Sequence, residues 1–195
     1  MIKIDRHIFF REYRKFFGSI KKQRTVDEIN SMLDFYEKEQ NNYNISIYHL
    51  AYIFATAYHE TAHDFIPKRE YGSTSYFIRK YWLNTRVAKW LGNDSAEEAV
   101  KYCGRGKVQI TGETNYEKYG IENNPEKAIE TEFSTYILFD GIMKGIFTGK
   151  KLATYINGNF RDYYNARRVI NGLDKANLIA GYARNFEKII TKSII

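Results

Sequence analysis

Apolar residues recur at helical spacing through much of the chain. Between residues 26 and 36 they lie three or four positions apart, which is the pattern of an amphipathic helix. At the start of this stripe, Thr25 and Glu28 fit a capping box, in which a hydroxyl and a carboxylate three residues later satisfy the first free amide groups of a helix. We therefore predict a helix capped at Thr25. Its apolar positions are Val26, Ile29, Met32, Leu33 and Tyr36.

A second apolar stripe leads into the segment His59–His63, which reads His-Glu-Thr-Ala-His. The spacing places Glu60 near the C-terminal part of an amphipathic helix. Pro67 should end that helix soon afterwards, because proline lacks the amide donor that a helix interior needs. The stripe comprises Leu50, Ile53, Phe54 and Ala57.

Further helices are predicted in the second half of the chain. Asn124 and Pro125 offer a cap and a first-turn proline for one of them, and Asp174 can begin the last. Ser95 and Glu98 fit another capping box, with only a short apolar stripe behind it. The stripe after Pro125 comprises Tyr136, Ile137, Phe139, Ile142, Met143 and Ile146, and the stripe after Asp174 comprises Ile179, Tyr182, Phe186 and Ile190.

The pattern changes between residues 90 and 119, where glycines bracket the segment 107–111. Apolar and polar residues alternate there, which predicts a small β element. Val108 and Ile110 should face the core, while Gln109 and Thr111 share the opposite face. No repeat or linker interrupts the chain. We expect one domain over residues 1–195, mainly α (α+β) in class.

Composition narrows the function classes. The formal net charge of +7 favours anionic partners such as nucleic acid, a membrane surface or a wall polymer. The basic residues are dispersed, so a nucleic-acid arm is not expected. The single cysteine, Cys103, excludes an internal disulfide and a cysteine-rich zinc site and indicates a reducing compartment. The 17 tyrosines suit a cleft for a polar ligand, although tyrosine also packs cores. No apolar leader or membrane span is present.

The segment His59–His63 allows two kinds of active site. Two histidines one helical turn apart can share a zinc ion, with Glu60 as general base. A third ligand is then needed. His7 and His49 both lie upstream, and no histidine follows His63, so only an acid such as Glu97 or Glu98 is left for that role.

The alternative is glycoside hydrolysis, which uses two carboxyl groups on either side of the scissile bond. Glu60 should lie partly against the apolar face of its helix, and such desolvation raises a carboxyl pKa, as a general acid requires. Glu70 is the second candidate, on the loop past Pro67, where Lys68 or Arg69 could keep it ionised. Its pattern also fits a surface glutamate in a charged turn.

Three segments, taken together, resemble glycoside hydrolase family 19. They are 55–62 (ATAYHETA), 104–112 (GRGKVQITG) and 166–176 (ARRVINGLDKA), and they occur in the family's order. That family comprises chitinases and the chitinase-like endolysins of bacteriophages, built on a lysozyme-like helical fold. With the helices between them, the three segments cover nearly the whole chain.

The resemblance implies roles for individual residues. Glu60 matches the general acid, and Glu70 is similar to the general base, although the loop between them is much shorter than in plant chitinases. Thr111 matches a position that holds the nucleophilic water, and Gln109 and Asn171 match sugar-contacting positions. In the same resemblance His59 orients neighbouring groups, Arg105 braces the site, and Tyr116 belongs either to the cleft or to the core.

We therefore expect an inverting, metal-free and cofactor-free hydrolase of β-1,4 links, with carboxyl groups roughly 6.5–9.5 Å apart. Peptidoglycan is the preferred polymer and chitin the second. The protein should be a monomer without stable membrane insertion, held in the host cytoplasm until a holin releases it to the wall. A zinc metallopeptidase and a non-catalytic wall-binding module remain as alternatives.

Overall fold

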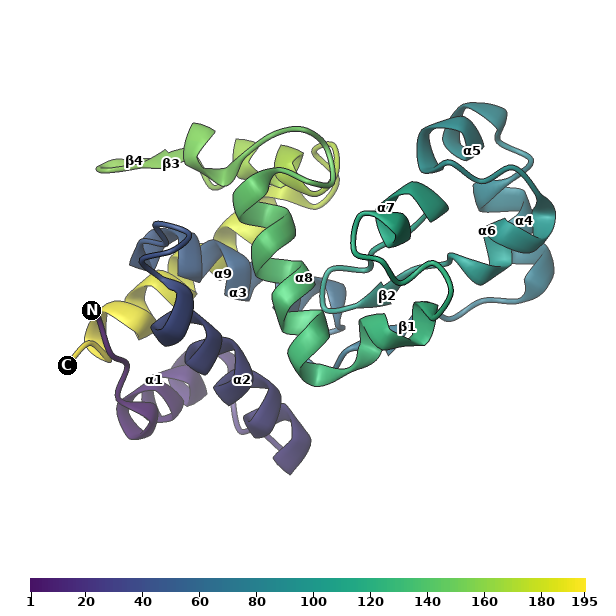
Figure 1. The fold of residues 1–195 in the computed structure, drawn as a ribbon. Helices are drawn as coiled ribbons and strands as arrows, with labels where there is room; N and C mark the ends of the chain where they lie inside the picture. The colour runs from purple at the N-terminus through teal and green to yellow at the C-terminus, as the bar shows by residue number, and fades with distance from the viewer. The chain divides into compact units, whose positions relative to one another are not determined.

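Most of the chain is helical, as the apolar spacing predicts. The computed structural model describes residues 1–195, with nine α-helices, three short 3-10 helices and two small antiparallel sheets (Figure 1). The residues form two compact units. Unit 1 comprises Met1–Ile66 and Leu138–Ile195, and unit 2 comprises Pro67–Ile137. The expected single domain stays a prediction. None of the helices is both long and apolar enough to cross a membrane.

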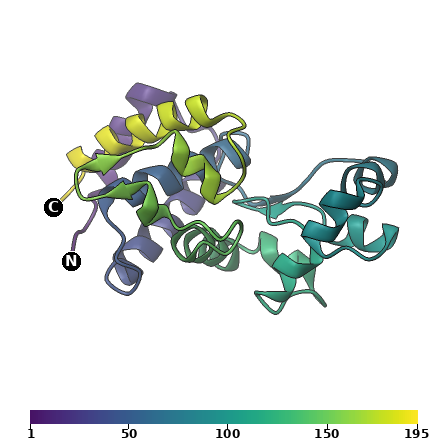
Figure 2. The same cartoon turned by 90° about the horizontal axis from the view of Figure 1, so that it is seen from above.

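In unit 1, helix α3 packs along α9, and α1 packs against α9 as well. The N- and C-terminal segments lie side by side (Figures 1 and 2), because Ile4 and Ile194 form an antiparallel bridge. The elements are α1 (Arg6–Phe17), α2 (Gln23–Glu39), α3 (Ile47–Glu60), the second half of α8 (Thr131–Lys144), the 3-10 helices η2 (Leu152–Thr154) and η3 (Asn165–Val169), the hairpin strands β3 (Ile156–Asn157) and β4 (Phe160–Arg161), and α9 (Ala176–Lys192).

The core of unit 1 is aromatic. The ring of Phe186 from α9 lies 5.4 Å from that of Phe54 and 4.8 Å from that of Phe17, centroid to centroid. Phe54 contacts Phe65 in turn, at 5.8 Å. Helix α3 is buried on nearly every side from residue 49 to residue 58, so the predicted amphipathic helix is instead a buried helix, as its largely apolar sequence allows. The residue that ends it, Glu60, is therefore carried by the most enclosed helix of the unit.

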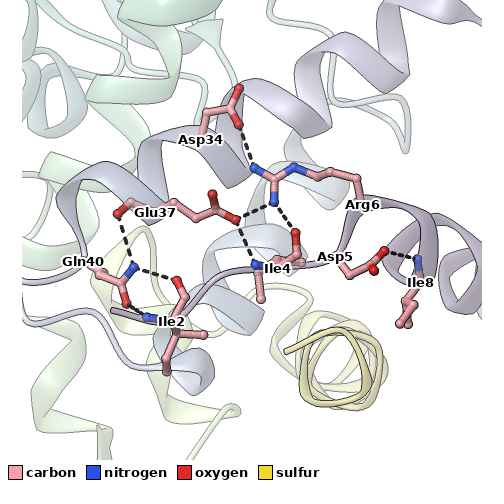
Figure 3. A network of polar contacts seen from close by, with 8 residues as sticks. All are labelled: Ile2, Ile4, Asp5, Arg6, Ile8, Asp34, Glu37 and Gln40. Carbon is pink, nitrogen blue, oxygen red and sulfur yellow. Dashed lines mark hydrogen bonds and ion pairs between the residues drawn. The ribbon is translucent and has the colours of Figure 1, made fainter. Parts of the chain in front are cut away.

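The N-terminal segment is tied to α2 by polar contacts (Figure 3). Arg6 donates to Glu37 and to Asp34, both at 2.7 Å. Gln40 accepts from the amide of Ile2 and donates to its carbonyl. The two bonds of Gln40 satisfy the amide and the carbonyl of Ile2, which would otherwise have no partner.

Helix α3 begins and ends with defined hydrogen bonds. Ser46 accepts from the amide of His49, and Nδ1 of His49 accepts from the amide of Ser46, so the two close a capping box. At the other end the Thr61 hydroxyl donates to the carbonyl of Ala57 and accepts from the amide of Phe65. The helix thus stops at Glu60, well before Pro67.

Two predicted helix starts are wrong by about two residues. Helix α2 begins at Gln23, and Thr25 lies inside its first turn, where its amide donates to the carbonyl of Lys22. Helix α9 begins at Ala176 after a left-handed Lys175, and the carbonyl of Asp174 accepts from Arg167.

The helix predicted from Asn124 is two helices. The 3-10 helix η1 (Pro125–Ile129) ends at an extended Glu130, and α8 begins at Thr131. Because the chain breaks at Glu130, η1 and α8 can both contact the turn at Gly106. A Cβ at Gly106 would lie 2.6 Å from the carbonyl oxygen of Ala128 and 2.9 Å from the hydroxyl of Ser134, so only glycine fits. The Asn124 side chain caps nothing.

Unit 2 is built on a short ribbon, β1 (Lys68–Arg69) paired antiparallel with β2 (Arg105–Gly106). Helices α4 (Thr74–Tyr81), α5 (Thr85–Leu91) and α6 (Ala96–Lys101) enclose a small apolar cluster, and α7 (Glu113–Glu117) and η1 follow. Ser95 caps α6 as predicted. The cluster consists of Phe77, Tyr81, Leu91, Ala99 and Cys103.

The segment 107–111 is a turn rather than the predicted strand. Arg105 and Ile110 exchange both backbone hydrogen bonds, and Gln109 between them takes a left-handed φ of 53°. Of the segment, only Ile110 pairs with β2, through a single antiparallel bridge to Arg105. The predicted faces still hold, since Val108 and Ile110 are buried and Gln109 and Thr111 are half-buried.

Candidate active site

The predicted site residues form two groups, one in each unit. In unit 1, Oε1 of Glu60 accepts from Nη1 of Arg167 at 2.7 Å. The Arg167 side chain is 4% exposed and that of Glu60 is 16% exposed. Nε of Arg167 donates to the carbonyl of Asp174 at 3.1 Å. One buried guanidinium therefore fixes both the carboxylate and the loop after η3.

This pairing affects what Glu60 can do. A general acid must carry a proton, and one of the two carboxyl oxygens of Glu60 is already bound by the guanidinium. Arg167 binds Oε1 only, and no hydrogen bond or ion pair to Oε2 is present. The carboxyl group is thus oriented through one oxygen and leaves the other open.

The two histidines of the motif do not share a helical face. His59 is on α3, but His63 lies beyond the helix end with a left-handed φ of 75°. Its ring stacks on Tyr58 at 4.3 Å, and its Nε2 lies 3.2 Å from the hydroxyl of Tyr182. The one-turn spacing that a zinc site needs is absent because the helix stops at Glu60. No group of three or more His, Cys, Asp or Glu side chains is placed to hold a metal ion.

His59 is half-buried beside Glu60. Burial lowers the pKa of its imidazole, the charge of Glu60 raises it, and Arg167 lowers it, with a lowered pKa as the net result. His59 is therefore neutral at neutral pH. A neutral imidazole can both donate and accept a hydrogen bond, as a group that orients its neighbours must.

In unit 2, Glu70 is surrounded by four donors. Oε1 accepts from Lys80 at 2.8 Å and from the Tyr76 hydroxyl at 3.2 Å. Oε2 accepts from the Tyr81 hydroxyl at 2.7 Å and from the amide of Gly104 at 3.2 Å. A carboxylate has about four acceptor positions. All of them are occupied here.

The donors keep Glu70 ionised. Burial raises the pKa of its carboxyl. The hydrogen bonds from Lys80, Tyr81 and Gly104 and the charge of Lys80 lower that pKa by more than burial raises it, so the net pKa is lowered. The cation that pairs with Glu70 is Lys80, not Lys68 or Arg69 as predicted from the sequence. The guanidinium of Arg69 lies instead over the ring of Phe77, at 5.4 Å.

Arg105 and Tyr116 lie in the interior of unit 2. Arg105 donates to Glu126 at 2.7 Å and to the carbonyls of Lys101 and Cys103. It also donates to the Tyr116 hydroxyl, which in turn donates to the carbonyl of Cys103 at 2.8 Å. Of the two alternatives for Tyr116, complete burial favours the core. Arg105 braces the backbone around β2.

The remaining candidates differ in how much of their side chain is engaged. The Gln109 amide donates to the carbonyls of Lys68 and Gly106, both at 3.0 Å. The Thr111 hydroxyl donates to the carbonyl of Gln109. Asn171, in unit 1, is exposed, and its side-chain oxygen accepts from the amide of Gly172. Gln109 therefore holds the β1–β2 ribbon, while Asn171 keeps an amide donor for a ligand.

Arg167, Lys80 and Tyr81 contact the candidate acids and were not singled out from the sequence. Arg167 falls in the third family-like segment, so that resemblance could have drawn attention to it. Lys80 and Tyr81 carry no comparable signal. Comparisons with protein-family models, curated proteins and solved structures found no match to this chain.

Proposed function

We propose that this protein is a glycoside hydrolase with a lysozyme-like fold that cleaves β-1,4 links of peptidoglycan with inversion. The observation that carries the proposal is the state of Glu60. Its carboxyl stands at the end of a buried helix, its side chain is 16% exposed, and Arg167 binds Oε1 whereas Oε2 has no hydrogen-bond partner in the protein. An oxygen in that position can hold the proton that a leaving glycosidic oxygen needs.

Glu70 takes the role of general base in this proposal. Its lowered pKa supports the role, because a base must be ionised before it can accept a proton from water. Since four donors surround the carboxylate, water reaches it by displacing one of the two longer hydrogen bonds, from Tyr76 or Gly104. Thr111 is the proposed second holder of that water.

Peptidoglycan is the proposed substrate because the chain is basic, with a formal net charge of +7, and the bacterial wall is anionic. Asn171 offers an exposed amide for sugar hydroxyls. We further propose a monomeric, endolysin-like enzyme without metal or cofactor that a holin releases from the host cytoplasm. Chitin, whose sugars carry no lactyl carboxylate, is the second candidate substrate.

The test is digestion of purified peptidoglycan and of chitin by the wild type, with and without a chelator, followed by mass spectrometry of the products. The proposal expects new reducing ends from peptidoglycan in both conditions. Glu60→Gln should abolish them while the circular dichroism spectrum stays unchanged. Glu37→Gln is the matched control, because Glu37 also pairs with an arginine in unit 1 and should be dispensable for activity.

Each contrary result has a distinct meaning. Free peptides that disappear with chelator would assign the protein to the metallopeptidases. Binding to the wall without any product would assign it to the binding modules. Normal lysis by Glu60→Gln would remove Glu60 from the chemistry altogether.

A further inference from the structure

The turn before α5 and the outer face of that helix expose large apolar side chains. Leu83 is 66% exposed and Trp90 is 62% exposed. Within unit 2 only Tyr71 is a more exposed large hydrophobic residue. The neighbouring Leu91 is packed in the apolar cluster, and Trp82 and Val87 pack against it. The apolar cluster is therefore filled by other residues, and Leu83 and Trp90 take no part in it.

Basic residues accompany these two side chains. Lys89 and Trp90 follow Arg86 by three and four positions, so these three residues share one face of α5. Leu83 lies in the exposed turn just before the helix. Arg86 and Lys89 are exposed and form no ion pair. We call Leu83, Arg86, Lys89 and Trp90 the α5 surface.

The stretch of sequence that contains α5 carries charges of one sign. From Tyr71 to Gly92 the chain holds four basic residues and no aspartate or glutamate. One of the four, Lys80, is occupied by Glu70. The others, Arg79, Arg86 and Lys89, have no acidic neighbour in this segment to neutralise them, so the surface suits an anionic partner.

Two classes of anionic partner, an acidic polymer and a lipid bilayer, are compatible with the cations, but only the bilayer uses both apolar side chains. A tryptophan and a leucine gain free energy when they enter the boundary between lipid headgroups and acyl chains, and adjacent lysines and arginines gain from anionic headgroups. A hydrated acidic polymer would bind the cations and leave Leu83 in water.

We propose that the α5 surface docks the protein peripherally on an anionic lipid bilayer, with Leu83 and Trp90 in the interface and Arg86 and Lys89 on the headgroups. No helix of the chain spans a membrane in this arrangement. The docking is separate from the proposed hydrolysis, since none of the four residues belongs to the candidate active site.

The test is sedimentation of the full chain with vesicles of phosphatidylcholine alone and with vesicles containing about a quarter phosphatidylglycerol. Binding is expected only to the second kind and should weaken with salt. Arg86→Gln with Lys89→Gln should lower the affinity about five-fold per charge. Leu83→Ser with Trp90→Ser should lower it at least about ten-fold.

Matched controls lie in unit 1. Lys150→Gln with Lys151→Gln removes the same charge from an exposed pair, and Phe160→Ser removes an aromatic ring that is 57% exposed. Both should bind vesicles as the wild type does. Glu60→Gln should also bind normally, which separates this proposal from the fate of the hydrolase assignment.

A second measurement locates the inserted side chain. Brominated lipid should quench the fluorescence of Trp82→Phe, in which only Trp90 remains, and should not quench Trp90→Phe. The proposal is overturned if anionic vesicles do not bind, or if the α5 variants bind as well as the controls. It is also overturned if the same residues retain the protein on purified wall polymer while vesicles do not.

Discussion

Arg167 and Glu60 form an ion pair of 2.7 Å although they are 107 positions apart in the sequence. Both side chains are largely enclosed in unit 1, so neither charge can be turned fully to water. Removing one partner from such a pair leaves the other charge buried, which costs more than removing both. The pair is therefore a sensitive point for stability as well as for the proposed acid.

Arg167→Met should destabilise the protein by about 3 kcal/mol, because Glu60 loses its countercharge. The double variant Arg167→Met with Glu60→Gln should recover part of that loss. Urea unfolding of the wild type, both single variants and the double variant measures the coupling. Arg168→Gln is the control, since the side chain of Arg168 forms a hydrogen bond only with the side chain of Asn165. Additive losses would show that the pair is not coupled.

Lys80→Met should raise the pKa of Glu70, because burial, which raises it, then loses its main opponent. A carboxyl whose folded pKa is lowered contributes stability above its ordinary pKa and loses it as the pH falls through the lowered value. The variant should therefore show a smaller acid-induced loss of stability below about pH 5. Carboxyl carbon NMR titration and urea unfolding measure the two effects. Lys89→Met, an exposed lysine, should change neither.

We expect the buried His49 to make the protein less stable in mild acid. Burial lowers the pKa of its imidazole, and its Nδ1 must stay unprotonated to accept from Ser46. Below about pH 6.5 the unfolded chain binds the proton that the folded chain refuses, so stability falls as the pH decreases from 7 to 5. His49→Gln should flatten that part of the profile. His7→Gln, at an exposed position, should leave the slope as it is, and equal slopes in all three proteins would contradict the prediction.

Phe186→Ala should destabilise unit 1 by about 3–5 kcal/mol, because it opens a cavity among the rings of the core. Phe186 is fully buried and contacts the rings of Tyr13, Phe17, Phe54, Tyr58 and Phe65. Phe160→Ala removes the same side chain from an exposed position and should change stability by less than about 0.5 kcal/mol. Thermal and urea unfolding of the two variants give the comparison.

The helical stripes could be predicted because a helix repeats its buried face every 3.6 residues, whatever it packs against. The apolar residues of α3 and α9 lie where that rule places them. Helix starts could not be predicted as well, since they depend on distant partners. Asp174 does not begin α9, since the left-handed Lys175 separates it from the helix and Arg167 binds its carbonyl, and η1 is separated from α8 where both meet the turn at Gly106.

In the candidate site, too, the helix position could be predicted from the sequence, but the distant partners could not. The position of Glu60 at a helix end followed from periodicity, but its partner Arg167 did not. For Glu70 the neighbouring Arg69 was the obvious cation. Adjacent residues of an extended segment point to opposite sides, so Arg69 turns to Phe77 and the carboxylate meets Lys80 from the next helix. Nearness in sequence is a poor guide to pairing in such segments.

Unit 1 is discontinuous in the sequence, and this sets an order of events during synthesis. The ribosome makes α1, α2 and α3, then the whole of unit 2, and only afterwards α9, the helix against which α3 packs. Unit 2, whose chain is continuous, can complete its fold while α3 still has its apolar surface uncovered. The segment that carries Glu60 can therefore reach its native packing only after α9 has been made.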